Sequence, residues 1–192
     1  MLNWIQNTVD VVTKYFISFG PLGGMLVIIL SSIYPLVFPL GVHIAFNVSA
    51  FGIFIGIVIS YIGTLIGCSI SFLLFKKVDT KLFKRFNEKE KVKKLKAKMK
   101  KISIPSLAVL TALPFTPAFL VNISAGLSGM DTKKFIIGIT IGKLPMVIFW
   151  AFVGKSLMES ITDWKTILMI VVMLVITYVI SKVLSKIFKW EV

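Results

Sequence analysis

Two long stretches of the chain carry no charged residue, and a strongly basic segment separates them. Positions 15–75 contain 61 residues without Asp, Glu, Lys or Arg, and positions 102–130 contain another 29. Since a helix that crosses a bilayer needs about 20 predominantly apolar residues, both stretches are long enough for membrane helices. This pattern predicts an all-α integral membrane protein.

Paired prolines interrupt both stretches where a straight helix would otherwise continue. Pro35 and Pro39 lie in the first stretch, and Pro114 and Pro117 lie in the second. Each proline removes a backbone donor, and lipid cannot satisfy the carbonyl that is set free. Broken backbone at membrane depth is tolerated inside protein or beside a water-filled cavity. The prolines therefore predict two re-entrant helical hairpins, the alternative being ordinary kinks in continuous helices.

The predicted fold has four transmembrane helices and two re-entrant hairpins that enter the membrane from opposite sides, all in one membrane domain. The predicted segments are an interfacial helix at 1–14, a span at 15–33, a hairpin at 34–50, a span at 51–75, a basic loop at 76–101, a hairpin at 102–130, and spans at 135–156 and 164–185. Both hairpins contain a similar tetrapeptide, Asn47-Val-Ser-Ala50 and Asn122-Ile-Ser-Ala125. Similar broken segments in corresponding halves favour an inverted repeat.

The distribution of charged residues indicates which side of the membrane each predicted segment faces. Residues 76–101 carry 12 Lys and one Arg against three acidic residues, which is +10 of the net charge of +14. Because cytoplasmic loops are rich in Lys and Arg, this loop and both termini are expected on the cytoplasmic side of the cell membrane. On the same side, Asp131 is predicted to cap the helix that begins at Thr132. Bilayer-length apolar chain on both sides of the loop indicates anionic lipid, and not nucleic acid, as its partner.

Apolar residues at helical spacing in the basic loop predict a short amphipathic helix that rests on the inner leaflet. Val92, Leu95, Met99 and Ile102 form its apolar face. The lysines assigned to the anionic-lipid surface are Lys91, Lys93, Lys94, Lys96, Lys98, Lys100 and Lys101. Each contributes about 1 kcal/mol of binding free energy near an anionic membrane surface.

The composition agrees with a membrane protein and excludes several classes. Hydrophobic residues make up 57% of the chain and charged residues 16%, which excludes a soluble globular domain with its about 45–50% apolar residues. A single cysteine, Cys68, and a single histidine, His43, exclude a disulfide scaffold and a Cys- or His-pair metal site. No nucleotide-binding, serine-hydrolase or zinc-protease motif is found, so neither an enzyme nor a bound cofactor or metal is predicted.

Motifs in both halves are similar to those of a known family. The first half contains segments 39–56, 61–67 and 72–77, and the second contains Leu113-Pro-Phe-Thr-Pro117 and segments 120–127 and 142–145. Over roughly residues 30–155 the chain resembles the DedA/VTT superfamily of SNARE-associated Golgi protein-like membrane proteins, and it looks closest to the Tvp-like branch. The resemblance implies opposed re-entrant hairpins and translocation of phospholipid or undecaprenyl phosphate.

The chain departs from the pattern of this family at two positions. Typical DedA members carry an acidic residue just after the first Pro-Gly and an arginine three residues before the proline of the second hairpin. Here Gly41 is followed by Val42 and His43, and the arginine position is Thr111. Because this acid–arginine pair is missing, the resemblance gives little support to proton-driven transport.

Polar or helix-breaking residues within the apolar segments are the candidate pathway and headgroup-binding residues. They are Pro35, Pro39, His43, Asn47, Thr111, Pro114, Pro117, Asn122 and Lys143. His43 is either a protonatable, headgroup-binding group or a neutral imidazole bonded to freed carbonyls. Lys143 lies deep in a predicted span, where charged side chains face a cavity unless they snorkel to an interface. The two asparagines bind phosphate oxygens or form structural bonds between helices.

Three pairs of glycines four residues apart predict close helix packing, which is the common role of such pairs in membranes. The pairs are Gly52/Gly56, Gly63/Gly67 and Gly138/Gly142. Their faces also offer a contact for a second copy of the chain.

These features predict a passive translocase that moves phosphate-bearing lipids between leaflets. Two alternatives stay open. One is a proton- or ion-coupled small-solute transporter on the same scaffold, in which His43 titrates. The other is a non-transporting organiser that binds anionic lipid through the basic loop.

Overall fold

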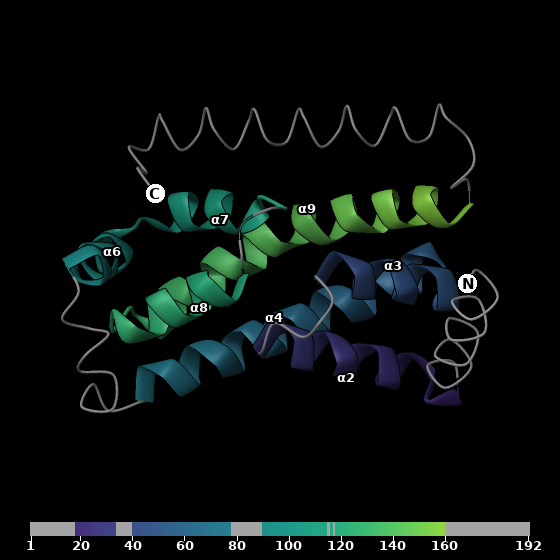
Figure 1. Cartoon of the computed structure of the whole chain (residues 1–192), viewed down its shortest axis with the longest axis horizontal. Coiled ribbons are helices and arrows are strands. Elements are labelled where there is room, and N and C mark those ends of the chain that lie inside the picture. The colour runs from purple at the N-terminus through teal and green to yellow at the C-terminus, as the bar shows by residue number, and fades with distance from the viewer. Residues whose placement is uncertain (1–17, 34–39, 78–89, 115, 117, 160–192) are drawn as a thin grey trace, which may run out of the picture.

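The computed structural model describes residues 18–33, 40–77, 90–114, 116 and 118–159 (Figure 1). In these ranges the regular secondary structure is entirely helical. The helices are α2 (Gly20–Ile33), α3 (Leu40–Phe51), α4 (Ile53–Lys77), α6 (Glu90–Lys101), α7 (Ile104–Ala112), α8 (Ala118–Leu127) and α9 (Thr132–Glu159). The described part of the chain thus confirms an all-α protein. The predicted segments at 1–14 and 164–185 lie outside the described residues.

Two of these helices are long and apolar enough to cross a membrane by their length and composition. They are α4 and the part of α9 from Thr132 to Gly154. The apolar helices α2, α3, α7 and α8 have only 9 to 14 residues. At a rise of about 1.5 Å per residue, none of them reaches across a hydrocarbon core of about 30 Å.

The two long helices expose apolar side chains and bury polar ones. Their exposed residues recur every three or four positions, and these include Phe54, Val58, Ile62, Ile66 and Ile70 on α4 and Ile137, Ile141, Leu144, Ile148 and Phe152 on α9. Residues at this spacing form a continuous face on a helix. Ser60, Thr64 and Ser71 of α4 and Lys143 of α9, in contrast, are buried. An apolar exterior around a polar interior suits lipid surroundings.

The second half of the described chain repeats the packing of the first half. In each half a short helix lies along a long one, α2 along α4 and α7 along α9. Of the remaining short helices, α8 lies against α4 of the other half, and α3 lies against both α9 of the other half and α4 of its own half. Since α4 and α9 run in opposite directions (Figure 1), the two halves have a similar helix order in inverted orientation.

Glycine pairs make the equivalent contacts of the two halves. A Cβ built on Gly67 of α4 would lie 2.6 Å from the carbonyl oxygen of Ile29 in α2, and a Cβ built on Gly138 of α9 would lie 2.6 Å from the Leu107 side chain in α7. Gly138 and Gly142 each lie 75 positions after their counterparts Gly63 and Gly67. The prediction of close packing is confirmed for these two pairs.

In the third pair, Gly56 confirms the predicted close packing, here between α3 and α4, while Gly52 forms a turn. Gly52 lies between α3 and α4 with a positive φ of 80°, which a residue with a side chain rarely adopts. Gly56 contacts the backbone of Val48 across this turn. The faces of the other two pairs are covered by α2 and α7, so a second copy of the chain would have to use another surface.

The structure differs from the sequence analysis in the extent of the first hairpin. Residues 15–33 were expected to form a straight span, with the hairpin at 34–50 following it. Instead α2 has 14 residues, runs parallel to α4, and is followed by α3, which runs back (Figure 1). The reason is that Gly63 and Gly67 hold α2 alongside α4. The pair α2–α3 is therefore the counterpart of α7–α8.

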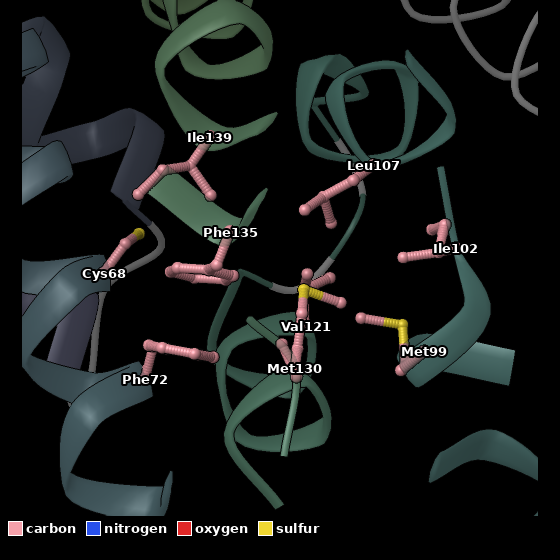
Figure 2. Close-up of a cluster of buried hydrophobic side chains, with 10 residues drawn as sticks. Cys68, Phe72, Met99, Ile102, Leu107, Val121, Met130, Phe135 and Ile139 are labelled. Carbon is pink, nitrogen blue, oxygen red and sulfur yellow. The ribbon is translucent and has the colours of Figure 1, made fainter. Parts of the chain in front are cut away.

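A hydrophobic cluster ties α6 to the helices of the second half, as Figure 2 shows. Met99 of α6 points toward Val121 and Met130 (Figure 2), and Met99 is 1% exposed. Ile102 is buried in the same cluster. The expectation that Met99 and Ile102 rest on the inner leaflet is therefore wrong, because protein side chains cover them.

Polar contacts fix the end of the molecule where α4 ends and α9 begins. The backbone N–H of Lys134 donates to the Asp131 carboxylate over 2.9 Å, which confirms Asp131 as the N-cap of α9. The Lys76 ammonium donates to the Met130 carbonyl and to the Thr132 hydroxyl, both over 2.9 Å. The last turn of α4 is thereby attached to the segment that connects α8 to α9.

Candidate functional site

Three hydroxyl side chains lie on one narrow strip of α4. Ser60, Thr64 and Ser71 are fully buried, and at 3.6 residues per turn they fall within about 40° of one another. The strip lies between the face that packs on α2, which carries Gly63 and Gly67, and the face that packs on α9. It extends over about 16 Å along the helix axis.

One asparagine contacts this strip, and a second asparagine from the other half bonds to the neighbouring helix α2. Asn47 of α3 donates from Nδ2 to the Ser60 hydroxyl over 2.9 Å and to the Gly24 carbonyl over 3.4 Å. Asn122 of α8 donates to the Ser32 carbonyl over 3.5 Å. We call Asn47, Ser60, Thr64, Ser71 and Asn122 the polar seam.

The two asparagines have equivalent places in the repeat. Asn122 lies 75 positions after Asn47, the same separation as between the paired glycines. Asn122 binds the backbone of Ser32, whose side chain packs on Gly67, and Gly67 lies between Thr64 and Ser71 on α4. Both asparagines form bonds between helices, which is one of the two roles that the sequence predicted for them.

Four polar atoms of the seam have no hydrogen-bond partner among the described residues. They are Oδ1 of Asn47, Oγ1 of Thr64, Oγ of Ser71 and Oδ1 of Asn122. A buried polar atom without a partner costs roughly 1–3 kcal/mol of folding free energy. Several such atoms in one seam make it the most polar part of the described interior and leave it hydrogen-bonding capacity for a ligand.

Lys143 lies in the middle of α9. Its side chain is 2% exposed. The acidic residues of α9, Asp131 and Glu159, lie about 18 and 24 Å away along the helix axis at 1.5 Å per residue. In the described part of the chain, no carboxylate pairs with this ammonium.

His43 is buried one helical turn before Asn47 on α3. Its Nδ1 lies 3.4 Å from the Ser31 hydroxyl, which itself donates to the Val27 carbonyl over 2.7 Å. A hydroxyl has one donor, so the imidazole Nδ1–H donates to Ser31. The structure thus places His43 in a bonded position between α3 and α2, close to one end of the seam.

The other predicted pathway residues are distributed differently. Thr111 is buried in the contact between α7 and α9, beside Gly142, and its hydroxyl donates to the Leu107 carbonyl over 2.9 Å. That hydroxyl therefore serves the packing of α7. Pro114 lies in the turn between α7 and α8. Pro35, Pro39 and Pro117 lie outside the described residues.

The predicted anionic-lipid surface is described in part. Lys98, Lys100 and Lys101 are exposed on α6, and Lys96 is half-buried. Lys91, Lys93 and Lys94 belong to α6, but their side chains lie outside the described part.

The buried hydroxyls of α4 were not among the predicted site residues. Ser60, Thr64 and Ser71 are separated by four and seven residues in an otherwise apolar helix. This spacing places residues on one face of a helix and could have identified the strip. What the spacing could not show is that the strip faces inward.

Comparison with known proteins gives the family of the chain. The VTT domain matches residues 38–156. A protein of Bacillus subtilis (strain 168), named "Uncharacterized membrane protein YhjE", is 32% identical over 147 residues, which cover 76% of this chain and 70% of that protein. No solved structure matches the chain. The chain is therefore a membrane protein that belongs to the VTT-domain family, in agreement with the resemblance of its sequence to the DedA/VTT superfamily.

Proposed function

We propose that this protein is a passive lipid translocase, in which the phosphate-bearing headgroup moves along the polar seam while the acyl or prenyl tails stay in lipid. The observation that supports this most directly is the seam itself, a buried line of unpartnered polar atoms inside a protein with an apolar exterior. Burying polar side chains at membrane depth costs free energy, and such side chains are typical of substrate pathways.

The proposed topology follows from helix lengths and packing. The long helices α4 and α9 cross the membrane, and the short pairs α2–α3 and α7–α8 enter it from opposite sides as re-entrant hairpins. The predicted span at 164–185 stays part of this proposal. The end with Lys76, Lys77, Lys133, Lys134 and α6 faces the cytoplasm of a cell membrane, since positive residues mark that side.

The hairpins provide what a headgroup needs in order to cross. A charged phosphate in hydrocarbon lacks donors, and its desolvation is the main barrier to flipping. Amides and hydroxyls of the seam offset part of that cost along about 16 Å of α4. We propose downhill movement because the family's acid–arginine pair is replaced here by Val42, His43 and Thr111.

Liposomes that contain the purified protein and a fluorescent phospholipid test this proposal. A membrane-impermeant quencher removes the outer-leaflet signal, and the remaining signal decays only if lipids flip. We expect flipping with the wild type and a rate at least tenfold lower with Asn122→Leu, which removes the amide from the seam. Ser69→Ala is the matched control, because the Ser69 hydroxyl bonds the Leu65 carbonyl of its own helix. Equal rates with wild-type and empty liposomes would refute the proposal.

A further inference from the structure

One face of helix α6 is held by the protein, and the rest of its described surface is exposed. Met99 is 1% exposed and belongs to the hydrophobic cluster of the second half, where it points toward Met130 (Figure 2). Lys98, Lys100 and Lys101 are exposed. At 3.6 residues per turn, these lysines lie about 100° or more from Met99 around the helix. The described outer surface of α6 is therefore predominantly basic.

The contact of Met99 also fixes the level of α6 along the long helices. Met130 directly precedes Asp131, the N-cap of α9, so α6 lies beside the point where α9 begins. In the proposed topology this point is the cytoplasmic boundary of the hydrocarbon, where lipid headgroups lie. The lysines of α6 are thus within reach of charged headgroups, because electrostatic attraction extends over a Debye length of about 8 Å at physiological ionic strength.

The tertiary structure brings further lysines to this end of the molecule. The Lys76 ammonium donates to the Thr132 hydroxyl over 2.9 Å, which joins the end of α4 to the start of α9. Lys77 and Lys133, their neighbours in the chain, are exposed. Among the side chains that the structure describes, Asp131 is the only acidic one, and it accepts the capping bond of α9. The described surface at this end therefore has a large excess of positive charge.

Helix α6 is attached to the second hairpin as well. It packs on α8, and Met99 points toward Val121 of α8 in the shared cluster (Figure 2). Packed side chains have low compressibility and transmit strain. A change in the position or order of α6 is therefore passed on to α8.

We propose that α6, together with the lysines at the adjoining ends of α4 and α9, is a docking surface for anionic lipid headgroups of the cytoplasmic leaflet, and that this docking orders the hairpin α7–α8. The proposal rests on the topology of the proposed function and adds a lipid that is bound at the surface and is not the transported one. Charge complementarity identifies this occupant, because the cytoplasmic leaflet has a negative surface potential that attracts basic segments beside membrane helices. Since protein covers the buried face of α6, the docking is electrostatic and does not need insertion into lipid.

Hydrogen exchange of the full-length protein in lipid nanodiscs tests the docking without a transport assay. Discs of phosphatidylcholine alone are compared with discs in which phosphatidylcholine is mixed with phosphatidylglycerol. We expect exchange of the α6 amides to be roughly threefold slower in the anionic discs. A salt concentration of about 1 M should remove the difference, because it shortens the Debye length to about 3 Å. Equal exchange of α6 in both kinds of disc would overturn the proposal.

Exposed lysines allow the charge to be removed without disturbing the packed face. The combined substitutions Lys98→Gln, Lys100→Gln and Lys101→Gln should abolish the difference between the discs. The matched control replaces the same three lysines by Arg, which keeps the charge and should keep the difference. A difference that persists in the Gln variant would contradict the assignment of α6 as the docking surface.

Exchange of the α8 amides reports on the hairpin. In the wild type we expect α8 to follow α6, with exchange roughly twofold slower in the anionic discs. Met99→Ala removes most of the side chain that joins α6 to the cluster, so α6 should still respond to anionic lipid, whereas α8 should not. Equal exchange of α8 in both kinds of disc for the wild type would show that docking does not order the hairpin.

Failure of this proposal is distinguishable from failure of the translocase proposal. Slower exchange of α6 in anionic discs, in a protein that does not flip lipid, supports the docking surface and contradicts the translocase activity. Lipid flipping by a protein whose α6 exchanges equally in both kinds of disc supports the translocase and overturns the docking surface.

Discussion

Buried side chains of this protein divide into those whose polar atoms are satisfied and those whose polar atoms are not. Ser32 and Thr111 use their hydroxyls within their own helices and serve packing. Thr64 and Ser71 do not, and their burial costs folding free energy without a compensating bond. Unsatisfied groups of this kind are expected where a ligand, and not the fold, provides the partner.

At Thr64 we expect stability and activity to change in opposite directions. Thr64→Val keeps the shape of the side chain and removes the unpartnered hydroxyl, so the free energy of unfolding should rise by up to about 1 kcal/mol. Lipid flipping should become slower. Denaturation in detergent and liposome assays measure the two effects. Thr140→Val, at an exposed hydroxyl bonded to the Ile136 carbonyl, is the control and should leave flipping unchanged. A Thr64→Val variant that is less stable than the wild type would contradict the assignment of the Thr64 hydroxyl as a group without a partner in the fold.

In the packed pairs of helices, glycines set the distance between the two helices. Gly67 brings α2 against α4 and Gly142 brings α7 against α9 in equivalent ways. In lipid, close packing of this kind replaces the hydrophobic effect as the main attraction between helices. The paired glycines were recognisable in the sequence, but their partners were not, because a glycine pair specifies a close contact without naming the helix that makes it.

A side chain at Gly67 should separate α2 from α4. In Gly67→Val the added Cβ would lie 2.6 Å from both the Ile29 carbonyl oxygen and the Ser32 Cβ, so the helices must move apart. We expect a loss of about 1–3 kcal/mol in the free energy of unfolding, measured by denaturation in detergent. Ile66→Val, at the neighbouring exposed position, should change it by less than about 0.5 kcal/mol. Equal effects of the two substitutions would show that α2 does not pack there.

At the scale of the whole molecule, two antiparallel halves surround one polar interior. Each half contributes a long helix and a short helix packed on it, while α8 packs on the long helix of the other half and α3 packs on both long helices. Asn47 bonds Ser60 within its own half, whereas Asn122 of the second half bonds the Ser32 carbonyl of the first half.

Cysteine labelling tests the opposed entry of the hairpins. In a Cys68→Ala background, Ser49→Cys near the end of α3 and Ser128→Cys after α8 report on opposite ends of the described molecule. A membrane-impermeant maleimide added to intact cells should label the first cysteine and not the second. Inside-out vesicles should give the reverse. Labelling of both from the same side would contradict the proposed topology.

Local features of the chain were predictable from the sequence, because they depend on neighbouring residues. The long uncharged runs indicated membrane helices, the Leu113–Pro117 segment marked the break between α7 and α8, and Asp131 was recognised as a cap. The same reasoning missed the hydroxyl strip on α4, since an apolar span with a few hydroxyls is compatible with either lipid or protein on every face.

The features that could not be predicted depend on contacts between segments that are distant in the sequence. Residues of α2, α3, α4 and α8 build the polar seam and its supports, and their sequence separations reach 90 residues between Ser32 and Asn122. Contacts between distant segments also make α2 one half of a hairpin, and they bury Met99. Amino-acid sequence determined which segments are helical and apolar, because hydropathy and backbone preference act locally. Only the tertiary structure decided which faces turn inward, because that depends on which helices pack together.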